Sequence, residues 1–229
     1  MNIFSKFFQH NWLAILYFNF KMLPWKQAIH LPFDFYYGVK FKKLCGDIIL
    51  DSDNVYRGMV KFGGRGSEMF SGHKVILNIV GKCEFRGQAE IGYGTFMHIS
   101  NGAIVKFGEK VRIGALCKLY ANKEIVFGDE IDVSWESQIF DTNFHEIKNL
   151  DDQKTITKDG IIRIGSFNWF GNRCNIMKGT ITPNHLIVAS NSLTNKDYTK
   201  DINPYSMLAG SPARLVKTNV QRLFEGVDL

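Results

Sequence analysis

The stretch that decides the fold is IRIGSFNWFGNRCNIMKGTITPNHLIVASNSLTN, which runs from Ile162 to Asn195. Read in sixes, it divides into IGSFNW, FGNRCN, IMKGTI, TPNHLI and VASNSL. The hexads begin at Ile164, Phe170, Ile176, Thr182 and Val188, and four of these five residues are bulky and apolar. A helix repeats about every 3.6 residues and a strand every two, so neither explains this period. The pattern therefore predicts a backbone that turns one apolar side chain inward every six residues.

Related segments occur earlier in the chain and share an apolar-x-apolar-glycine pattern. VKFG is found at 60–63 and again at 105–108, and later copies of the pattern end at Gly128 and Gly165. Gly108 and Gly128 are 20 residues apart. The longer interval from Gly128 to Gly165 contains the polar stretch HEIKNLDDQKTITKDG, and about one repeat remains when that stretch is removed. Internal repetition therefore organises most of the chain.

Three sides of six residues make a triangular coil, and stacked coils form a parallel β-helix. Isolated coils could not bury their inward side chains, so several must stack. We expect this all-β domain over residues 46–200, with a protruding loop at about 145–160. The hexad register slips around 94–101 and within 46–78, which predicts irregular coils there.

The two ends of the chain lack the repeat. In the aromatic-rich N-terminal extension, residues 1–45, NWLAILYFNFKML predicts a short helix ended by Pro24. LPFDFYYGVKFKKL predicts extended chain whose aromatic residues cover the open end of the core. In the C-terminal tail, residues 201–229, RLVKTNVQRLFEG predicts a short terminal helix with Gly226 near its end.

Composition narrows the classes of protein and of partner. The chain has 229 residues, 45% hydrophobic and 22% charged, which is ordinary for a globular protein. The net charge of +6 fits an anionic ligand, a polyanion or a membrane surface, and equally a basic surface without a partner. Cys45, Cys83, Cys117 and Cys174 contain no CxxC spacing, so we interpret them as small buried hydrophobes in a reducing compartment.

The apolar run 12–18 is too short to span a bilayer, which takes about 20 residues. No small-residue cleavage site follows it, as a signal peptide would require. We therefore expect a cytoplasmic protein, and leave open a peripheral contact between this segment and a membrane.

The hexads quoted above, together with YSMLAGSPARLVK, resemble the hexapeptide-repeat acyltransferases in their galactoside/maltose O-acetyltransferase-like branch. The shared features are an Ile-Gly hexad, a Trp-Phe-Gly step, a Lys-Gly turn and an Ala-Gly-x-Pro-Ala-Arg ending. The resemblance covers about residues 85–217 and implies a left-handed β-helix, a hand that spacing alone does not fix. Phe170 departs from the usual isoleucine, TPNHLI from an Ile-Gly-Asp hexad, and Ser190-Asn191 from an Ala-Gly pair.

The resemblance implies transfer of an acetyl group from acetyl-CoA to a hydroxyl or amine, without a covalent enzyme intermediate and with a histidine as general base. His145 is the candidate among six histidines, because IFDTNFHEI lies where the hexads end and the polar loop begins. Asp141 and Glu146 are candidates to orient that imidazole, and Asn143 to bind the acceptor. Each of the three could equally cap the loop turn.

His98 and Asn101, in MHISNG, could line the acceptor side, or have a structural role instead. Trp135 is interpreted as coil surface or as a platform for the acceptor. The resemblance implies CoA contacts at Trp169, Asn172, Ser190, Lys196, Arg214 and Lys217. For Trp169 the alternative is packing at a coil corner. For the basic residues the alternative is solvated surface charge.

The resemblance further implies a homotrimer with active sites at subunit interfaces, acting on a sugar or a surface-polysaccharide precursor, with no metal and no nucleic acid. An N-acetyltransferase of an aminosugar nucleotide and a non-catalytic β-helix scaffold remain alternatives. A β-helix carbonic anhydrase is disfavoured because it needs three histidine ligands, and the gaps His73–His98 and His98–His145 are 25 and 47 residues. Neither GxSxG nor a P-loop motif occurs.

Overall fold

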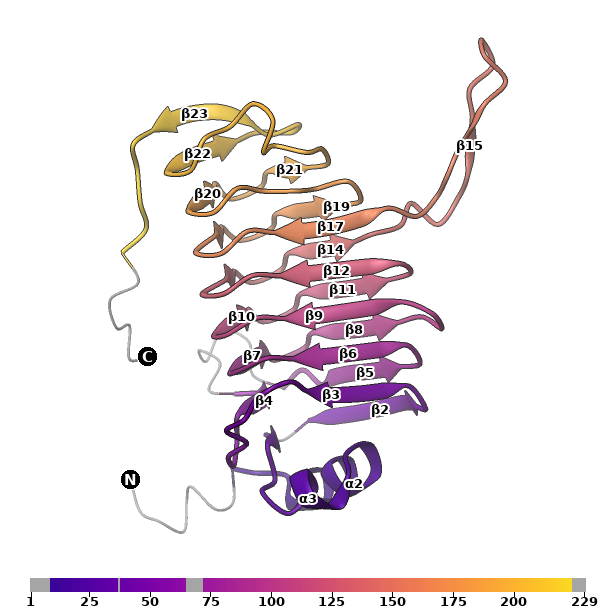
Figure 1. Cartoon of the computed structure of the whole chain (residues 1–229), viewed down its shortest axis with the longest axis vertical. Coiled ribbons are helices and arrows are strands. Elements are labelled where there is room, and N and C mark those ends of the chain that lie inside the picture. Colours follow the sequence, from indigo (N-terminus) through magenta and orange to yellow (C-terminus); the bar gives the residue numbers. More distant parts are fainter. Residues whose placement is uncertain (1–8, 37, 65–71, 224–229) are drawn as a thin grey trace.

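The computed structural model describes residues 9–36, 38–64 and 72–223. Its body is a stack of coils wound about one long axis, and most coils contribute a strand to each of three sides (Figure 1). Apart from the last strand of the chain, neighbouring strands on each side come from successive coils and pair in parallel. This is the parallel β-helix that the hexads predict.

The three sides are sheets of nine, seven and five strands in the described chain. The nine-stranded sheet contains β1 (Phe33–Phe35), β4 (Val60–Gly63), β7 (Ala89–Gly92), β10 (Val111–Ile113), β13 (Asp132–Val133), β18 (Trp169–Phe170), β20 (Leu186–Val188), β22 (Ser206–Ala209) and β23 (Arg214–Thr218). The seven-stranded sheet contains β2 (Val39–Leu44), β5 (Val75–Ile79), β8 (Phe96–Ile99), β11 (Lys118–Ala121), β14 (Gln138–Phe140), β19 (Asn175–Met177) and β21 (Leu193–Thr194). The five-stranded sheet contains β3 (Asp47–Leu50), β6 (Lys82–Phe85), β9 (Ile104–Phe107), β12 (Glu124–Phe127) and β17 (Ile161–Ile164).

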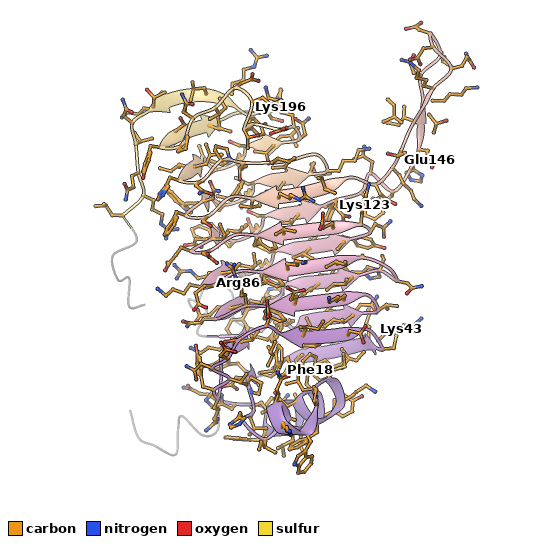
Figure 2. All side chains as sticks on the ribbon, in the orientation of Figure 1. Phe18, Lys43, Arg86, Lys123, Glu146 and Lys196 are labelled. Atoms are coloured by element: carbon orange, nitrogen blue, oxygen red, sulfur yellow. The ribbon has the colours of Figure 1, made fainter. Side chains whose placement is uncertain are left out.

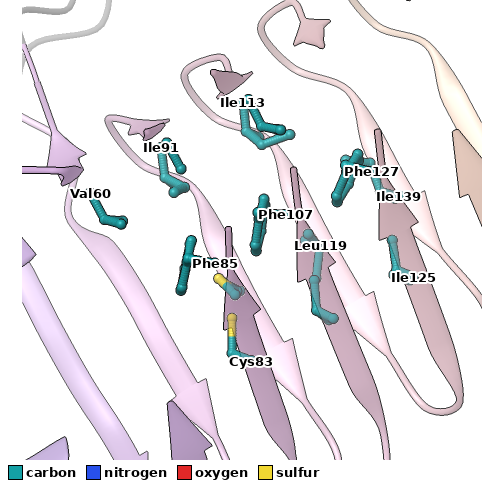
Figure 3. Packing of buried hydrophobic residues seen from close by; sticks show 14 of the residues in the cluster. Val60, Cys83, Phe85, Ile91, Phe107, Ile113, Leu119, Ile125, Phe127 and Ile139 are labelled. Atoms are coloured by element: carbon teal, nitrogen blue, oxygen red, sulfur yellow. The ribbon is translucent and has the colours of Figure 1, made fainter. Parts of the chain in front are cut away.

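Identical positions of successive coils stack in columns inside the prism. Phe85, Phe107 and Phe127 are paired in register, and their rings stack with centroids 4.8 and 5.2 Å apart (Figure 3). All three are almost completely buried. Because side chains alternate across a strand, the residue next to each of these phenylalanines in its strand points outward to solvent. The inward columns make one continuous apolar core along the axis.

At Gly81, Gly108, Gly128 and Gly165, the glycine that ends the apolar-x-apolar-glycine segment is required by close backbone contact between coils. A Cβ on Gly108 would lie 2.3 Å from the carbonyl oxygen of Gly128 in the next coil. Backbone atoms cannot move aside as a flexible side chain could, so a larger residue there would separate the coils. The recurring glycine therefore marks a corner at which successive coils touch.

The N-terminal end of the core is closed by helix α2 (Trp12–Met22), followed by the short helix α3 (Trp25–Ala28). This confirms the predicted helix before Pro24. Asn11 caps α2 by accepting a hydrogen bond from the Ala14 N–H at 3.2 Å. Phe18, on α2, packs its ring against Phe33 at 5.0 Å and Phe35 at 5.1 Å. The aromatic residues of this segment therefore cover the open end of the core, as expected.

The stack begins earlier than the hexads indicate. Strands β1 and β2 lie within the predicted extension, yet they pair in parallel with β4 and β5. The region 94–101, predicted to be irregular, instead contains β8, which pairs regularly with β5 and β11. That prediction was wrong because Thr95, Met97 and Ile99 still fill the core. Of the four cysteines Cys45 is exposed, and the other three are buried.

The predicted terminal helix is wrong within the described chain. Residues Arg214–Thr218 form β23, which pairs antiparallel with β22. The last strand of the stack would otherwise leave a row of unpaired backbone groups, and β23 satisfies them. No helix follows as far as residue 223, and residues 224–229, which include Gly226, lie outside the described residues.

Candidate active site

His145 lies at the foot of a hairpin that leaves the stack between β14 and β17. The hairpin strands are β15 (Ile147–Lys148) and β16 (Thr155–Ile156), and they project well beyond the prism (Figure 1). Its neck is closed by a bridge between Thr142 and Asp159 and by a 2.9 Å hydrogen bond from the Asn143 N–H to the Lys158 carbonyl. The His145 side chain is exposed, so it can be reached by a substrate.

Asp141, just inside the neck, is fully buried. Its carboxylate accepts hydrogen bonds from the backbone N–H groups of Asn122 and Lys123, each at 2.7 Å. Burial raises the pKa of the Asp141 carboxyl, although these amide hydrogen bonds oppose the shift. Both oxygens are thus used to fix the turn of the preceding coil, and within one chain the structure does not direct them at His145. Asp141 thus caps a turn of the preceding coil and not the loop turn considered from the sequence, and a role in orienting His145 stays a prediction.

Asn143 and Glu146 are exposed neighbours of His145 in the same loop. Figure 2 shows Glu146 at the foot of the hairpin, on the edge of the stack that also carries Lys123 and Lys43. Within the described chain, neither side chain forms a hydrogen bond with the His145 imidazole.

An aromatic column runs along the outer face of the seven-stranded sheet toward His145. Tyr120 and Phe140 occupy equivalent positions in β11 and β14. Phe144, next to His145 in sequence, packs its ring 4.9 Å from Tyr120 and 5.8 Å from Phe140. On the other side Tyr120 stacks on His98 at 4.2 Å with the rings only 12° from parallel. The structure thereby brings His98 and the His145 loop to one face.

His98 belongs to a directional chain of hydrogen bonds. The Asn78 amide donates to His98 Nδ1 at 2.6 Å, which leaves the proton of the neutral imidazole on Nε2. Nε2 donates to Ser100 at 3.0 Å, Ser100 to the Asn122 oxygen at 2.6 Å, and the Asn122 amide to Asp159 at 3.1 Å. The chain therefore connects the His98 face to the hairpin neck.

Burial and the positive charge of Lys42 lower the pKa of His98, which favours the neutral form required by this network. A shallow hollow of about 600 Å³ lies beside it. Lys40, Lys43 and Asn101 contribute to its lining, together with Lys42 and His98. Both residues predicted for the acceptor side therefore line a real concavity.

Trp169 lies on the nine-stranded sheet, whereas His145 lies at the corner between the other two sheets. Its indole N–H donates to Ser134 Oγ at 3.2 Å, and the Arg222 guanidinium carbon lies 5.1 Å from the ring centroid. Arg222 also forms an ion pair with Asp132 at 2.6 Å. Within one chain, Trp169 and His145 are therefore not brought together, and the C-terminal tail covers part of the indole.

The other candidate CoA contacts are distributed over two corners and the end of the stack. Ser190 donates to the Asn172 side-chain oxygen at 2.6 Å, where the nine- and seven-stranded sheets meet. Lys196 lies beyond β21, with its ammonium 3.6 Å from Asp201 and 5.4 Å from the Tyr198 ring centroid.

Arg214 and Lys217 are on β23, which is exposed along its whole length. Trp135 is partly exposed at the corner shared with Asn172, away from the His145 loop. The structure therefore gathers Asn172, Ser190 and Trp135 near one corner but leaves the basic candidates apart.

Sequence reasoning missed the aromatic column formed by Tyr120, Phe140 and Phe144. The available signal was coil register, because Tyr120 and Phe140 occupy the same outward position as His98 in successive coils. Phe144 carried no such signal, because it lies where the chain leaves the repeat.

In the described ranges, no group of three or more His, Cys, Asp or Glu side chains could hold a metal ion. Over these same ranges, the helices are all too short to cross a lipid bilayer.

Comparison with protein-family models gave no match, and no curated protein matched either. Among solved structures, the polySia specific acetyltransferase NeuO is similar over 85% of this chain and 84% of its own, with TM-score 0.50 and 21% identity. The chain is a left-handed β-helix. The fold expected from the hexads and from the resemblance is thereby confirmed, whereas the galactoside/maltose branch stays a prediction.

Two further acyltransferase structures are more distantly similar. The polysialic acid O-acetyltransferase OatWY matches with TM-score 0.36 and 20% identity over 80% of this chain and 81% of its own. AntD, an N-acyltransferase from Bacillus cereus crystallised with dTDP and 3-hydroxybutyryl-CoA, matches with TM-score 0.41 and 12% identity, over 81% of this chain and 79% of its own. At these levels of similarity, neither decides what this β-helix binds.

Proposed function

We propose that this protein is an acetyl-CoA-dependent O-acetyltransferase that acts on a sugar or a surface-polysaccharide precursor. The observation that carries the proposal is the exposed imidazole of His145, held at a closed hairpin neck and next to an aromatic face. A general base must be accessible to the proton that it removes, and His145 meets that condition. The shared fold with an acetyltransferase supports the same reaction class.

The reaction would be a direct transfer between two bound substrates. The neutral imidazole of His145 accepts the proton of the acceptor hydroxyl while the oxygen attacks the thioester carbonyl carbon. The tetrahedral intermediate then breaks its C–S bond, the protonated imidazole returns the proton to the departing sulfur, and the products are the acetyl ester and free CoA. No bond to the protein forms at any stage.

The outer face of the seven-stranded sheet is the proposed acceptor surface. Its strands contain no Asp or Glu among the described residues, but they do contain Lys40, Lys42, Lys43 and Lys118. The other two sheets carry charges of both signs, and several of these charges form ion pairs, as in Arg112–Asp132 and Arg163–Glu124. An unbalanced positive face beside aromatic rings favours an acceptor that carries negative charge.

The donor would lie against Trp169, Asn172 and Ser190, with its phosphates near Lys196, Arg214 and Lys217. Because Trp169 and His145 are on different sides of one prism, donor and base can meet only if neighbouring chains pack side by side. We therefore propose a homotrimer with active sites between subunits. A cytoplasmic location fits both a CoA donor and four free cysteines.

The decisive experiment measures CoA release from acetyl-CoA with a panel of neutral, acidic and amino sugars. His145→Ala should reduce the rate at least about a hundredfold, because a general base contributes that much or more, while acetyl-CoA affinity stays nearly unchanged. His30→Ala, which removes another exposed histidine at the far end of the stack, is the matched control. A fully active His145→Ala protein would refute the mechanism.

The same panel separates the alternatives. Acetylation of an amine in preference to a hydroxyl would assign the protein as an N-acetyltransferase, for which AntD provides a precedent on the same kind of scaffold. If no acceptor in the panel supports CoA release, and the protein also fails to bind acetyl-CoA, the scaffold alternative would be favoured.

A further inference from the structure

Helix α2 is apolar on both faces. Ala14, Ile15 and Phe18 are buried and close the core. On the opposite side Leu13, Leu16, Tyr17 and Phe20 are exposed, with Leu13 83% exposed. These four residues follow the i, i+3, i+4, i+7 spacing of one helix face. A helix that is apolar all round is normally covered on all sides, so the outer face of α2 lacks a covering layer within the described chain.

The exposed apolar face of α2 is extended by two further residues, Trp25 and Ile29, which follow α2 in the sequence. Trp25 is 71% exposed and its ring lies 5.1 Å from Phe20, and Ile29 is exposed just beyond α3. We call the six residues Leu13, Leu16, Tyr17, Phe20, Trp25 and Ile29 the cap patch. It lies on the two helices at the N-terminal end of the prism, opposite the end that carries β22 and β23 (Figure 1). Contiguous large apolar side chains on a surface usually mark an interaction site.

The charged residues of helices α2 and α3 are all of one sign. Lys21 and Lys26 lie within it, and the Lys21 ammonium is 5.9 Å from the Tyr17 ring centroid. The first 33 residues contain no Asp or Glu. The first acid, Asp34, is buried and hydrogen-bonded to His10 at 2.8 Å. The partner that suits this surface therefore combines an apolar layer, which the apolar side chains can enter, with anionic groups that the lysines can reach.

We propose that the cap patch docks the protein end-on to an anionic lipid surface. Leucine and aromatic side chains enter the boundary between headgroups and acyl chains, while lysines extend to the phosphates. Each lysine near a negatively charged leaflet adds to the attraction. A second copy of the chain fits less well, because a symmetric contact would place Lys21 and Lys26 near their own equivalents, with no acid in the segment to balance them.

End-on docking has a geometric consequence for the rest of the molecule. The hairpin and His145 lie several coils away along the stack, near the other end of the prism (Figure 1). The bound protein would therefore hold His145 and the hairpin away from the bilayer, facing the solution. The proposal does not depend on the acyltransferase reaction.

The test is co-sedimentation of the full chain with vesicles of phosphatidylcholine alone or mixed with phosphatidylglycerol. The unaltered protein should bind the mixed vesicles, and binding should weaken as salt is raised. Leu13→Ser/Leu16→Ser/Trp25→Ser should reduce the fraction bound about tenfold or more. Lys21→Glu/Lys26→Glu should remove the preference for phosphatidylglycerol. Because all these side chains are exposed, circular dichroism and thermal melting should show an unchanged fold.

The matched control is Leu150→Ser/Val216→Ser, which removes exposed apolar residues from the hairpin and from β23. It should bind vesicles as the unaltered protein does. Equal binding by the triple serine variant, or no binding by the unaltered protein, would overturn the proposal. The proposal would also fail if sedimentation velocity showed that the triple serine substitution acts only by dissociating an oligomer. It would fail as well if deletion of residues 1–8 abolished vesicle binding while the triple serine variant still bound.

Discussion

His98 shows how one outward side chain is committed to a single protonation state. It accepts a hydrogen bond from Asn78, donates one to Ser100 and stacks on Tyr120. A protonated ring would need an acceptor at Nδ1, where the Asn78 amide group donates. Lys42 adds a like charge nearby. The hydrogen bonds and the electrostatics of this residue therefore favour the same neutral form.

The pKa of His98 should accordingly lie below the ordinary value of about 6.5. Because the folded-state pKa is below the unfolded one, the stabilising contribution of His98 is fully present above that ordinary value. It is lost as pH falls through the folded-state pKa. NMR titration of the imidazole measures the shift directly. A midpoint at or above about 6.5 would contradict the prediction.

His98→Gln keeps a polar side chain but cannot titrate. The loss of unfolding free energy between about pH 7 and about pH 5 should be smaller in this variant than in the unaltered protein, when both are measured by urea unfolding.

At the scale of elements, the stacked strands derive their stability from columns that run through all coils. Phe107 lies between Phe85 and Phe127 and is sealed from solvent. Each of these rings contacts equivalent residues above and below, so removing one affects two interfaces between coils. The corner glycines allow that spacing, because Gly108 leaves no room for a side chain.

Phe107→Ala should lower the free energy of unfolding by about 3–5 kcal/mol, since it leaves a ring-sized cavity in the column. Urea unfolding with a spectroscopic readout measures it. Val216→Ala, at an exposed position of β23, should change stability by less than about 0.5 kcal/mol. Equal effects of the two substitutions would mean that the aromatic column does not hold the coils together.

The elements that sequence predicted well are those whose signal is local. Ile164, Phe170 and Ile176 repeat every six residues and are buried as expected. The sequence of Arg214–Thr218 has a helical pattern, but these residues form a strand because they pair with the open edge of β22. In the site, the loop that holds His145 was predictable because the repeat stops there. The contact of Phe144 with Tyr120 was not, because it depends on how the hairpin neck folds back.

For the whole molecule, the separation of Trp169 from His145 makes assembly the central question. One residue lies on the nine-stranded sheet and the other at the opposite corner, so a single prism cannot present both to one substrate. Side-by-side packing of parallel prisms would place the corner of one chain near the face of the next. The proposed trimer therefore has a functional test as well as a hydrodynamic one.

Mixing His145→Ala and Trp169→Ala chains in equal amounts, with refolding together, should restore activity to about a quarter of the unaltered level. In such a mixture a quarter of the interfaces combine an intact His145 from one chain with an intact Trp169 from its neighbour. Each variant refolded alone should stay inactive or weak. No recovery in the mixture would place both residues in the same chain's site, and a monomer in sedimentation velocity would exclude the trimer.

The hairpin that carries β15 and β16 is structurally independent of the prism, because its neck is closed. Gly160 donates its N–H to the Asp141 carbonyl at 2.8 Å, so the chain returns almost to the point at which it left. β14 and β17 keep their regular registers with the adjacent coils on either side of the detour. Hairpins of other lengths and sequences could therefore be exchanged at this neck without disturbing the coil stacking, and lengthening a loop whose ends are already joined costs little entropy. Substrate range could thus diversify by replacing one peripheral module while the supporting prism stays the same.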